Sequence, residues 1–278
     1  MPEEPIMEIT ASLIKEVKEK TGAGVVDCKQ TLLETKGDIN KAVEILKKKG
    51  LSKADKKAGR ETKEGCIVYE CSKGKGLLLK VNCETDFVAM TDDFKNFVKE
   101  VRDIIFSKDY PFSSVLPEEV ENLRRNAIAK LGENILVSEW RFIKSRKELF
   151  PYLHLSKVGT IVDFEAGKIT DDVELLIKNI AMQITAMNPI AVDAKSIPAE
   201  KMTEVKTAFS EEAKATGKPD KIIENIVKGR LEKYYSENVL LEQLYILDEE
   251  KKVGQILDEF IKEKGIPFKV NSFIRISL

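Results

Sequence analysis

Apolar residues at helical spacing predict three short helices in the N-terminal part of the chain. Gly22 and Gly37 are the candidate stops of the first two helices. The third is predicted from Asp38, a candidate N-cap, to the residue before Gly50. Three helices of this length enclose only a small core. We therefore expect this unit to pack against the rest of its own chain or against a partner.

After a lysine-rich stretch the apolar period changes from helical to alternating, as is typical of strands. Residues 66–71 and 77–83 are predicted to form a hairpin joined by Ser-Lys-Gly-Lys-Gly. An amphipathic helix is predicted over 91–107, with Thr91 as its N-cap. The remaining elements of this half are a helix over 117–131 and a strand over 135–143.

The second half of the chain repeats the order of a strand pair followed by a long helix. The strands are predicted over 152–156 and 158–165, with a very short connection, and the helix over 171–187. Charged helices and a closing strand follow, over 198–216, 219–235, 252–264 and 268–276. The predicted fold class is therefore α+β, with an N-terminal three-helix domain and then two similar subdomains of antiparallel sheets and packed helices.

The predicted domain boundaries follow these changes of period. A three-helix, partner-binding domain is expected over 1–52, and a charged linker over 53–64. The first core subdomain is expected over 65–145 and the second over 146–278, the latter including the helical segment 198–264.

The charge balance argues against a nucleic-acid partner. The 278 residues include 46 basic and 47 acidic side chains, which gives a net charge of −1. Proteins that bind nucleic acid by neutralising phosphates normally present a basic surface, so we expect no direct nucleic-acid contact. The nearest basic cluster has eight Lys or Arg residues between Lys47 and Lys63, and we interpret it as a solvated helix end and linker.

Neither a membrane span nor a signal peptide is predicted. No run approaches the ~18 consecutive apolar residues that a span requires. The N-terminus lacks the basic region and apolar run of a signal peptide. We therefore expect a cytoplasmic protein that contacts no membrane.

No residue pattern indicates an active site. The cysteines form no Cys-x-x-Cys pair and are interpreted as free, mostly buried thiols, so neither a metal site nor a cofactor is expected; they are Cys28, Cys66, Cys71 and Cys83. The only histidine, His154, has no Gly-x-Ser-x-Gly elbow to accompany it and is expected on a surface or an interface. A phosphate-binding Gly-x-x-x-x-Gly-Lys-Ser/Thr loop is absent too. We expect no enzymatic activity.

One segment, residues 82–89, places large apolar side chains where a connection is predicted. Because the next helix is expected to begin at about Thr91, Phe87 and Val88 fall between a strand and a helix. These side chains either pack beneath the loop or are displayed to a partner, and the sequence leaves both open. A displayed Phe ring that a partner buries contributes about 2 kcal/mol. Asp86, beside it, is costly to bury unless it meets a donor or a cation.

Two motifs resemble the elongation factor Ts family, the nucleotide-exchange factors of elongation factor Tu. They are Thr21-Gly-Ala-Gly-Val-Val-Asp-Cys-Lys29 with Gly37-Asp-Ile39, and Val81-Asn-Cys-Glu-Thr-Asp-Phe-Val-Ala89. Shorter matches occur in the family's order: Lys56-Lys-Ala-Gly59, Gly132-Glu-Asn134, Ile180-Ala-Met182, Gly217-Lys-Pro219, Val253-Gly-Gln255 and Phe273-Ile-Arg275. The resemblance covers the chain from Met7 onward, which makes Met7 a candidate start.

The resemblance implies a fold, a partner and a set of contacts. The three-helix domain would be ubiquitin-associated-like, and the partner would be elongation factor Tu, GDP-bound or nucleotide-free, with a homodimer within a heterotetramer also allowed. The implied element that disturbs the partner's Mg²⁺ site and releases GDP is Thr85, Asp86, Phe87 and Val88, with Phe87 as a wedge. Further implied contacts lie at Val25, Val26, Lys57, Ile135, His154 and Val253.

Two other classes of function stay open on the residues alone. One is an adaptor that binds ubiquitin-like or other helical partners through the three-helix domain, although the long α+β remainder with its own motif weighs against it. The other is a thiol or metal enzyme built on three cysteines and the single histidine, that is, on Cys66, Cys71, Cys83 and His154.

Overall fold

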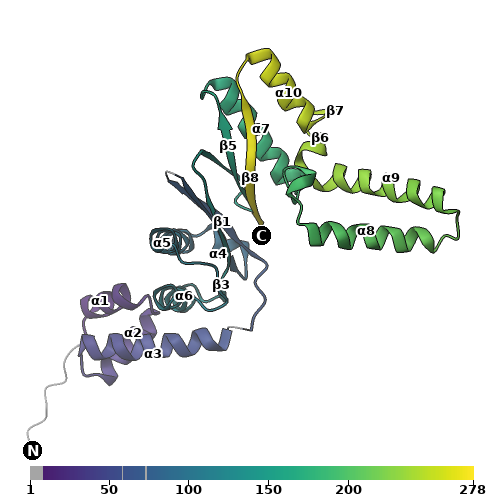
Figure 1. Ribbon diagram of the computed structural model, residues 1–278. Helices are drawn as coiled ribbons and strands as arrows, with labels where there is room; N and C mark the ends of the chain where they lie inside the picture. Colours follow the sequence, from purple (N-terminus) through teal and green to yellow (C-terminus); the bar gives the residue numbers. More distant parts are fainter. Residues whose placement is uncertain (1–8, 58, 73) are drawn as a thin grey trace, which may run out of the picture. The chain divides into compact units, whose positions relative to one another are not determined.

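The computed structural model describes residues 9–57, 59–72 and 74–278 and has a mixed α+β fold (Figure 1). The predicted fold class is confirmed: N-terminal helices precede sheet-containing units. The chain forms two compact units. The first consists of residues up to Glu70 with Leu79–Arg141 and Ser277–Leu278, and the second of Cys71–Leu78 with Phe142–Ile276. The candidate start at Met7 lies outside the described residues.

Three helices form the N-terminal part of the first unit: α1 (Ala11–Thr21), α2 (Val25–Glu34) and α3 (Ile39–Lys57). The Thr10 hydroxyl caps α1 by accepting a hydrogen bond from the Leu13 backbone N–H at 3.3 Å. A small apolar core joins the three helices and consists of Val17, Cys28, Leu32, Ala42 and Leu46. The helices predicted from the apolar period are therefore present.

The expected end of α3 at Gly50 is wrong, because the helix continues to Lys57. Gly50 lies where α3 crosses α6 (Glu118–Leu131), and a Cβ built on it would be 3.1 Å from the Ala129 Cβ. The glycine allows two helices to approach closely, and it does not stop the first. The expected packing of the small N-terminal unit against its own chain is thus observed. The basic cluster expected from Lys47 to Lys63 includes side chains outside the described set, at 47 and 51–55.

A three-stranded sheet follows, in the order β1 (Glu64–Ser72), β2 (Lys75–Cys83) and β3 (Ile135–Lys144). Helix α5 (Asp92–Lys108) begins as predicted, with the Thr91 hydroxyl accepting from the Phe94 N–H at 3.2 Å. The predicted apolar stripe of α5 is its buried face, formed by Phe94, Phe97, Val98, Val101 and Ile105.

The second sheet has the order β4 (Glu148–His154), β5 (Val158–Ala166) and β8 (Phe268–Ser277). Strands β4 and β5 are antiparallel, and Tyr152 lies opposite Thr160. The very short connection expected here is a tight turn, but it lies at Leu155 and Ser156, which were predicted to belong to the strand; both have positive φ angles, 50° and 55°. Positive φ at both central residues gives a turn whose twist matches that of the paired strands.

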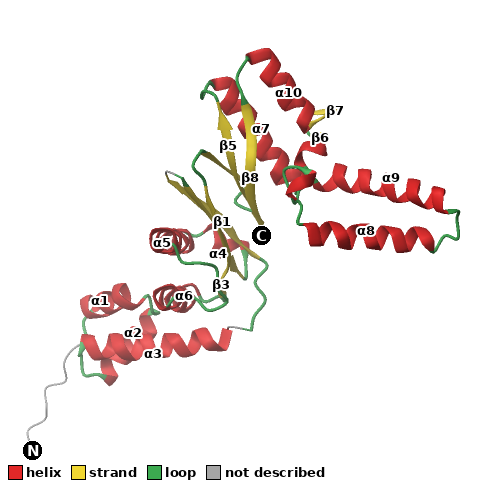
Figure 2. Cartoon of the chain, in the orientation of Figure 1, coloured by secondary structure: helices red, strands yellow, loops and turns green. Residues whose placement is uncertain are grey.

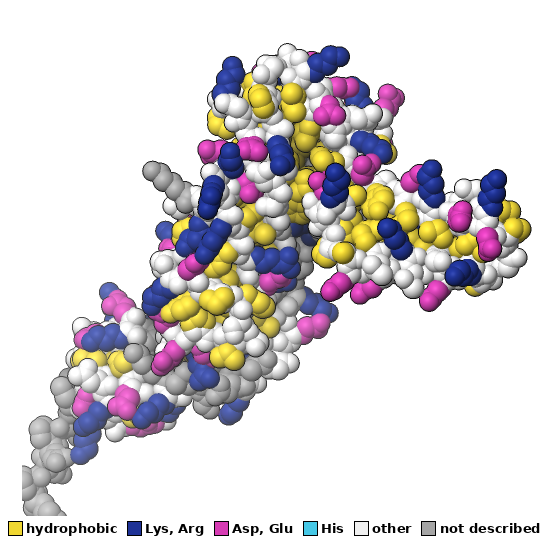
Figure 3. Space-filling view, in the orientation of Figure 1, with side chains coloured by type: hydrophobic (Ala, Val, Ile, Leu, Met, Phe, Trp, Pro, Cys, Tyr) yellow, Lys and Arg dark blue, Asp and Glu magenta, His cyan; other side chains and the backbone are white. Residues whose placement is uncertain are grey.

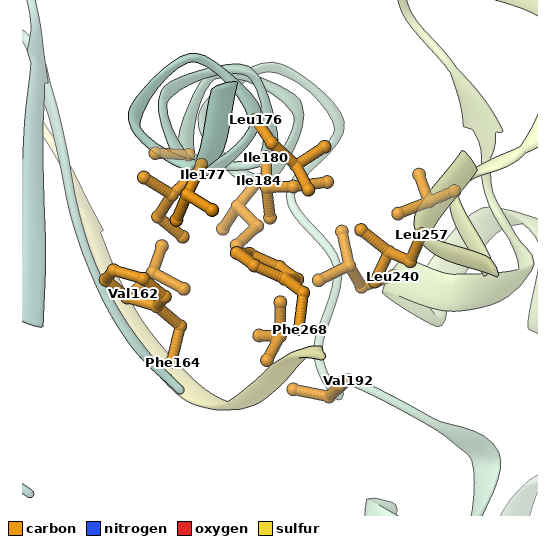
Figure 4. Packing of buried hydrophobic residues seen from close by; sticks show 14 of the residues in the cluster. Val162, Phe164, Leu176, Ile177, Ile180, Ile184, Val192, Leu240, Leu257 and Phe268 are labelled. Carbon is orange, nitrogen blue, oxygen red and sulfur yellow. The ribbon is translucent and has the colours of Figure 1, made fainter. Parts of the chain in front are cut away.

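Helix α7 (Asp171–Met187) provides the main apolar face of the second unit. Figure 4 shows Ile177, Ile180 and Ile184 pointing from this helix toward Phe268 on β8. Two further parts of the chain complete the same core, Leu240 and α10 (Val253–Lys264), which contributes Leu257.

Two long helices, α8 (Ala199–Lys214) and α9 (Asp220–Asn238), run side by side as a hairpin (Figure 2). Between α9 and α10 lie two strands that the sequence did not predict, β6 (Leu244–Tyr245) and β7 (Asp248–Lys252). Each residue of β7 is charged, so it has no apolar alternation to reveal it. Two short 3-10 segments, Ala194–Ser196 and Leu240–Glu242, complete the chain.

We predict that Ile180→Ala lowers the free energy of unfolding by about 2–5 kcal/mol, because it removes a fully buried side chain from α7. Leu175→Ala, on the same helix but 59% exposed, is the matched control and should change it by about 0.5 kcal/mol or less. Urea titration followed by circular dichroism measures both. Equal losses for the two variants would contradict the placement of the core.

Candidate partner-binding site

Phe87 lies on a short helix and not in an open connection. Helix α4 spans Asp86–Met90, so the expectation that no helix begins before Thr91 is wrong. The Thr85 hydroxyl caps this helix by accepting from the Val88 N–H at 3.3 Å. A helix of five residues is too short to show an apolar period, which is why the sequence pattern missed it.

The sequence left open whether Phe87 packs beneath its loop or is exposed to a partner, and in the structure it is exposed. The Phe87 side chain is 80% exposed and Met90, on the same helix, is 68% exposed. Asp86 is also exposed, and its carboxylate accepts the Phe87 backbone N–H at 2.9 Å. Val88 is half-buried. The helix therefore presents an aromatic ring and a carboxylate side by side.

A carboxylate from a distant loop holds the start of α4. Glu133 Oε2 accepts the backbone N–H groups of Glu84 and Thr85, each at 3.0 Å. Glu133 Oε1 accepts the Thr85 hydroxyl at 2.6 Å. Charged acceptors form the shorter and stronger hydrogen bonds of proteins.

The loop that carries Glu133 also donates hydrogen bonds to residues near the start of α4. Glu84 Oε1 accepts the Asn134 backbone N–H at 2.6 Å and lies 3.5 Å from the Arg60 guanidinium. The Asn134 amide donates to the Arg60 carbonyl at 2.8 Å. Lys57, at the end of α3, donates to the carbonyl of Gly132. We call Gly132–Asn134 the bracket loop.

Sequence reasoning did not assign a role to Glu84 or Glu133. A signal was present, because Gly132-Glu-Asn134 is one of the short matches to the elongation factor Ts family. The contacts of that segment could not be predicted from the sequence, since Glu133 and Thr85 are 48 positions apart.

The other expected contact residues differ in their exposure. Val25 and Val26 are 52% and 76% exposed at the start of α2. His154 is exposed at the end of β4. Ile135 and Val253 are fully buried, so any contact at these two positions has to use backbone atoms or neighbouring side chains.

These expected contact residues are brought together only in part. Lys57 and Ile135 lie at the bracket loop, the first bonded to it and the second directly after it, and the loop holds Thr85. His154 and Val253 belong to the second compact unit.

The four cysteines are thiols outside any disulfide, as predicted; Cys28 and Cys83 are buried, and Cys66 and Cys71 are partly so. Burial, aided by the negative charge of Glu133, raises the pKa of the Cys83 thiol to about 12. Its sulfur donates to the Thr85 carbonyl at 3.2 Å. Among the described residues no three Cys, His, Asp or Glu side chains are grouped as they would be around a metal ion.

On the face of the molecule shown in Figure 3, the charged side chains of the described residues do not gather by sign. Figure 3 shows Lys and Arg interspersed with Asp and Glu over the described part of the visible face. Within the described residues, no helix is both long and apolar enough to cross a bilayer.

Comparison with known proteins decides the family. The family model described as "Elongation factor TS" matches residues 84–278, a span that includes α4 and the bracket loop. Elongation factor Ts of Chlorobium phaeobacteroides strain BS1 is 40% identical over 285 residues, which cover 98% of this chain and 99% of that protein. Elongation factor Ts of Aquifex aeolicus strain VF5 is 40% identical over 289 residues and covers 98% of both chains.

The chain belongs to the elongation factor Ts family. It is therefore a translation elongation factor and takes part in protein biosynthesis. The full-length relatives extend the elongation factor Ts match over the N-terminal helices, which precede the segment that the family model covers.

We predict that Cys83 resists alkylation in the folded protein. At pH 9 an unfolded cysteine, with a pKa of about 8.5, is largely ionised, whereas the raised pKa keeps the folded Cys83 protonated. Iodoacetamide treatment and peptide mass spectrometry should find Cys83 unmodified in buffer and modified in urea. Because unfolding releases this proton, Cys83 also makes stability fall as pH rises from about 8.5 toward about 12. Equal modification of Cys83 in buffer and in urea would contradict the burial.

Proposed function

We propose that this chain is the guanine nucleotide exchange factor of elongation factor Tu. In this proposal it binds the GDP-bound partner in the cytoplasm, inserts α4 near the Mg²⁺ site and promotes release of GDP. The observation that supports the proposal most directly is the display of Phe87 on a helix held at its start by Glu133. The mechanism requires binding alone and no catalytic chemistry in this chain.

The energetics indicate how much of the exchange one ring supplies. Burying an exposed Phe side chain in a partner contributes about 2 kcal/mol. Shifting a nucleotide affinity by several thousandfold takes about 5 kcal/mol of coupling between the two ligands. The ring alone therefore accounts for less than half of such coupling, and other contacts have to supply the rest.

Asp86 is the first of these other contacts. Its exposed carboxylate accepts the Phe87 backbone N–H, so docking of Phe87 brings a negative charge close to the same place. Mg²⁺ is bound through oxygen ligands and keeps several of its waters. A carboxylate that enters such a site competes for the ion with the groups that hold it and weakens the binding of the phosphates that share it.

The N-terminal helices offer a second surface for the same partner. Val25 and Val26 are exposed on the first turn of α2, and we propose that they contact the nucleotide domain as well. Lys57 and His154 are proposed as further contacts. A partner that is touched at several places gains specificity beyond what α4 provides.

We predict that the wild-type protein strongly accelerates release of a fluorescent GDP from elongation factor Tu, measured by stopped flow. Phe87→Ala should slow release by about tenfold, since it removes the most exposed large apolar side chain of α4. Asp86→Ala should slow it too. Val115→Ala is the matched control, because Val115 is 77% exposed but lies between α5 and α6, outside the site.

Two outcomes count against this proposal in different ways. Release that is unchanged by the wild-type protein removes the exchange function. Equal rates for wild type, Phe87→Ala and Asp86→Ala remove α4 as the working element and leave the exchange function standing.

A further inference from the structure

Helix α4 has no fully buried residue and only Val88 and Ala89 are partly buried, so packing alone does not hold it. At five residues it is also well below the length at which a helix is stable by itself in water. The orientation of α4 is therefore set mainly by the hydrogen bonds at its two ends. The direction of the Phe87 ring therefore depends on what fixes these two ends.

The C-terminal end of α4 is fixed by α5. Thr91 is both the C-cap of α4 and the N-cap of α5, and its N–H and its hydroxyl both donate to the Val88 carbonyl, at 3.0 and 2.8 Å. Helix α5 is in turn fixed by its buried face, which includes Phe94 and Val98. This end of α4 thus inherits the position of a packed helix.

At the N-terminal end of α4, one side chain accepts three hydrogen bonds. Two backbone N–H groups and one hydroxyl, from Glu84 and Thr85, converge on the Glu133 carboxylate. The Thr85 hydroxyl also accepts the Val88 N–H, so a continuous chain of hydrogen bonds runs from α4 through Thr85 to Glu133. Phe87 lies between Thr85 and Val88, the two residues of this segment that belong to the chain of hydrogen bonds.

We infer that Glu133 is a positioning residue, which sets the direction of the Phe87 ring before the partner is met. The inference rests on the proposed exchange function and adds a residue to it. A ring that is already directed loses little conformational freedom on docking, so more of the docking energy is available to distort the nucleotide site. Without Glu133, the start of α4 loses three hydrogen bonds and the ring samples other directions.

Glu133 can do this because the bracket loop is itself held from several sides. Gly132 ends α6 in the left-handed conformation, with φ 81°, and its carbonyl accepts the Lys57 ammonium. The Asn134 N–H is bonded to Glu84 at 2.6 Å. The loop therefore connects the end of α3, the end of α6 and the start of α4.

Hydrogen exchange of the free protein tests the positioning directly. We expect Glu133→Ala to speed amide exchange of residues 84–90 by about tenfold, because two of these amides lose a charged acceptor. Exchange in α5, over 94–105, should not change. Glu118→Ala, which removes an exposed carboxylate from the first turn of α6, is the matched control and should leave both segments unchanged.

Glu133→Gln keeps the shape of the side chain and is the second variant, should the alanine form fold poorly. Its amide oxygen still accepts the two backbone N–H groups, but its nitrogen has no lone pair for the Thr85 hydroxyl. We expect the amide hydrogen exchange rates of residues 84–90 to lie between those of the wild type and those of Glu133→Ala. Thermal unfolding confirms that each variant is folded at the temperature of the measurement.

Fluorescent GDP release over a range of factor concentrations gives the second readout. A positioning role lowers the release rate at saturating factor by about tenfold, the scale of one charge-assisted hydrogen bond, and changes the half-saturating concentration less. A role in folding alone lowers the concentration of active factor, which shifts the half-saturating concentration and leaves the saturating rate unchanged.

The outcomes separate the two claims. Unchanged exchange of residues 84–90 in both Glu133 variants overturns the positioning role. Faster exchange with an unchanged saturating rate overturns its importance for release. If the wild-type protein releases no GDP, the proposed function fails, and the exchange data still show whether Glu133 holds α4.

Discussion

An aromatic ring in water tends to turn back onto its own protein, so a chain that displays one has to hold it outward by some other means. Here that means is the Glu133 carboxylate, on which three donors from the residues before and at the cap of α4 converge. Helix α4 has no fully buried side chain. Hydrogen bonds to a charged acceptor are strong enough to replace packing over so short a segment.

Two packed helices define the ends of this arrangement. Helix α5 is fixed by its buried aromatic and aliphatic face, and through Thr91 it fixes the last turn of α4. Helix α6 ends at Gly132 and delivers Glu133 opposite Thr85. The end of α3 reaches the same loop through Lys57, so the N-terminal helices and α4 share one attachment point. Contacts of the N-terminal helices with a partner would thus act on a segment already connected to the displayed ring.

Membership of the elongation factor Ts family gives this geometry its meaning. The relatives from Chlorobium phaeobacteroides and Aquifex aeolicus match almost the whole chain, so the family relation includes the second unit as well as the first. The proposed exchange activity requires that the protein bind one state of its partner better than another. By linkage, the nucleotide lowers the affinity of the partner for the exchange factor by the same factor as the exchange factor lowers the affinity for the nucleotide. Such a protein needs an aimed contact surface and a stable support for it.

The sequence by itself determined the elements that carry a long apolar period or a clear cap. Helices α5 and α7 lie where their stripes predict them, and Thr91 caps as expected, since these signals are local and repeat over several turns. Short or wholly charged elements, α4 and β7, carry no such period, and Gly50 looks like a helix stop although it serves a helix crossing. Only the tertiary structure decided that Phe87 is displayed and that Glu133 bonds to the two residues before α4. The physical reason is that the donors and their acceptor are 48 and 49 positions apart, and the folding of α6 against its neighbours brings them within 3.0 Å.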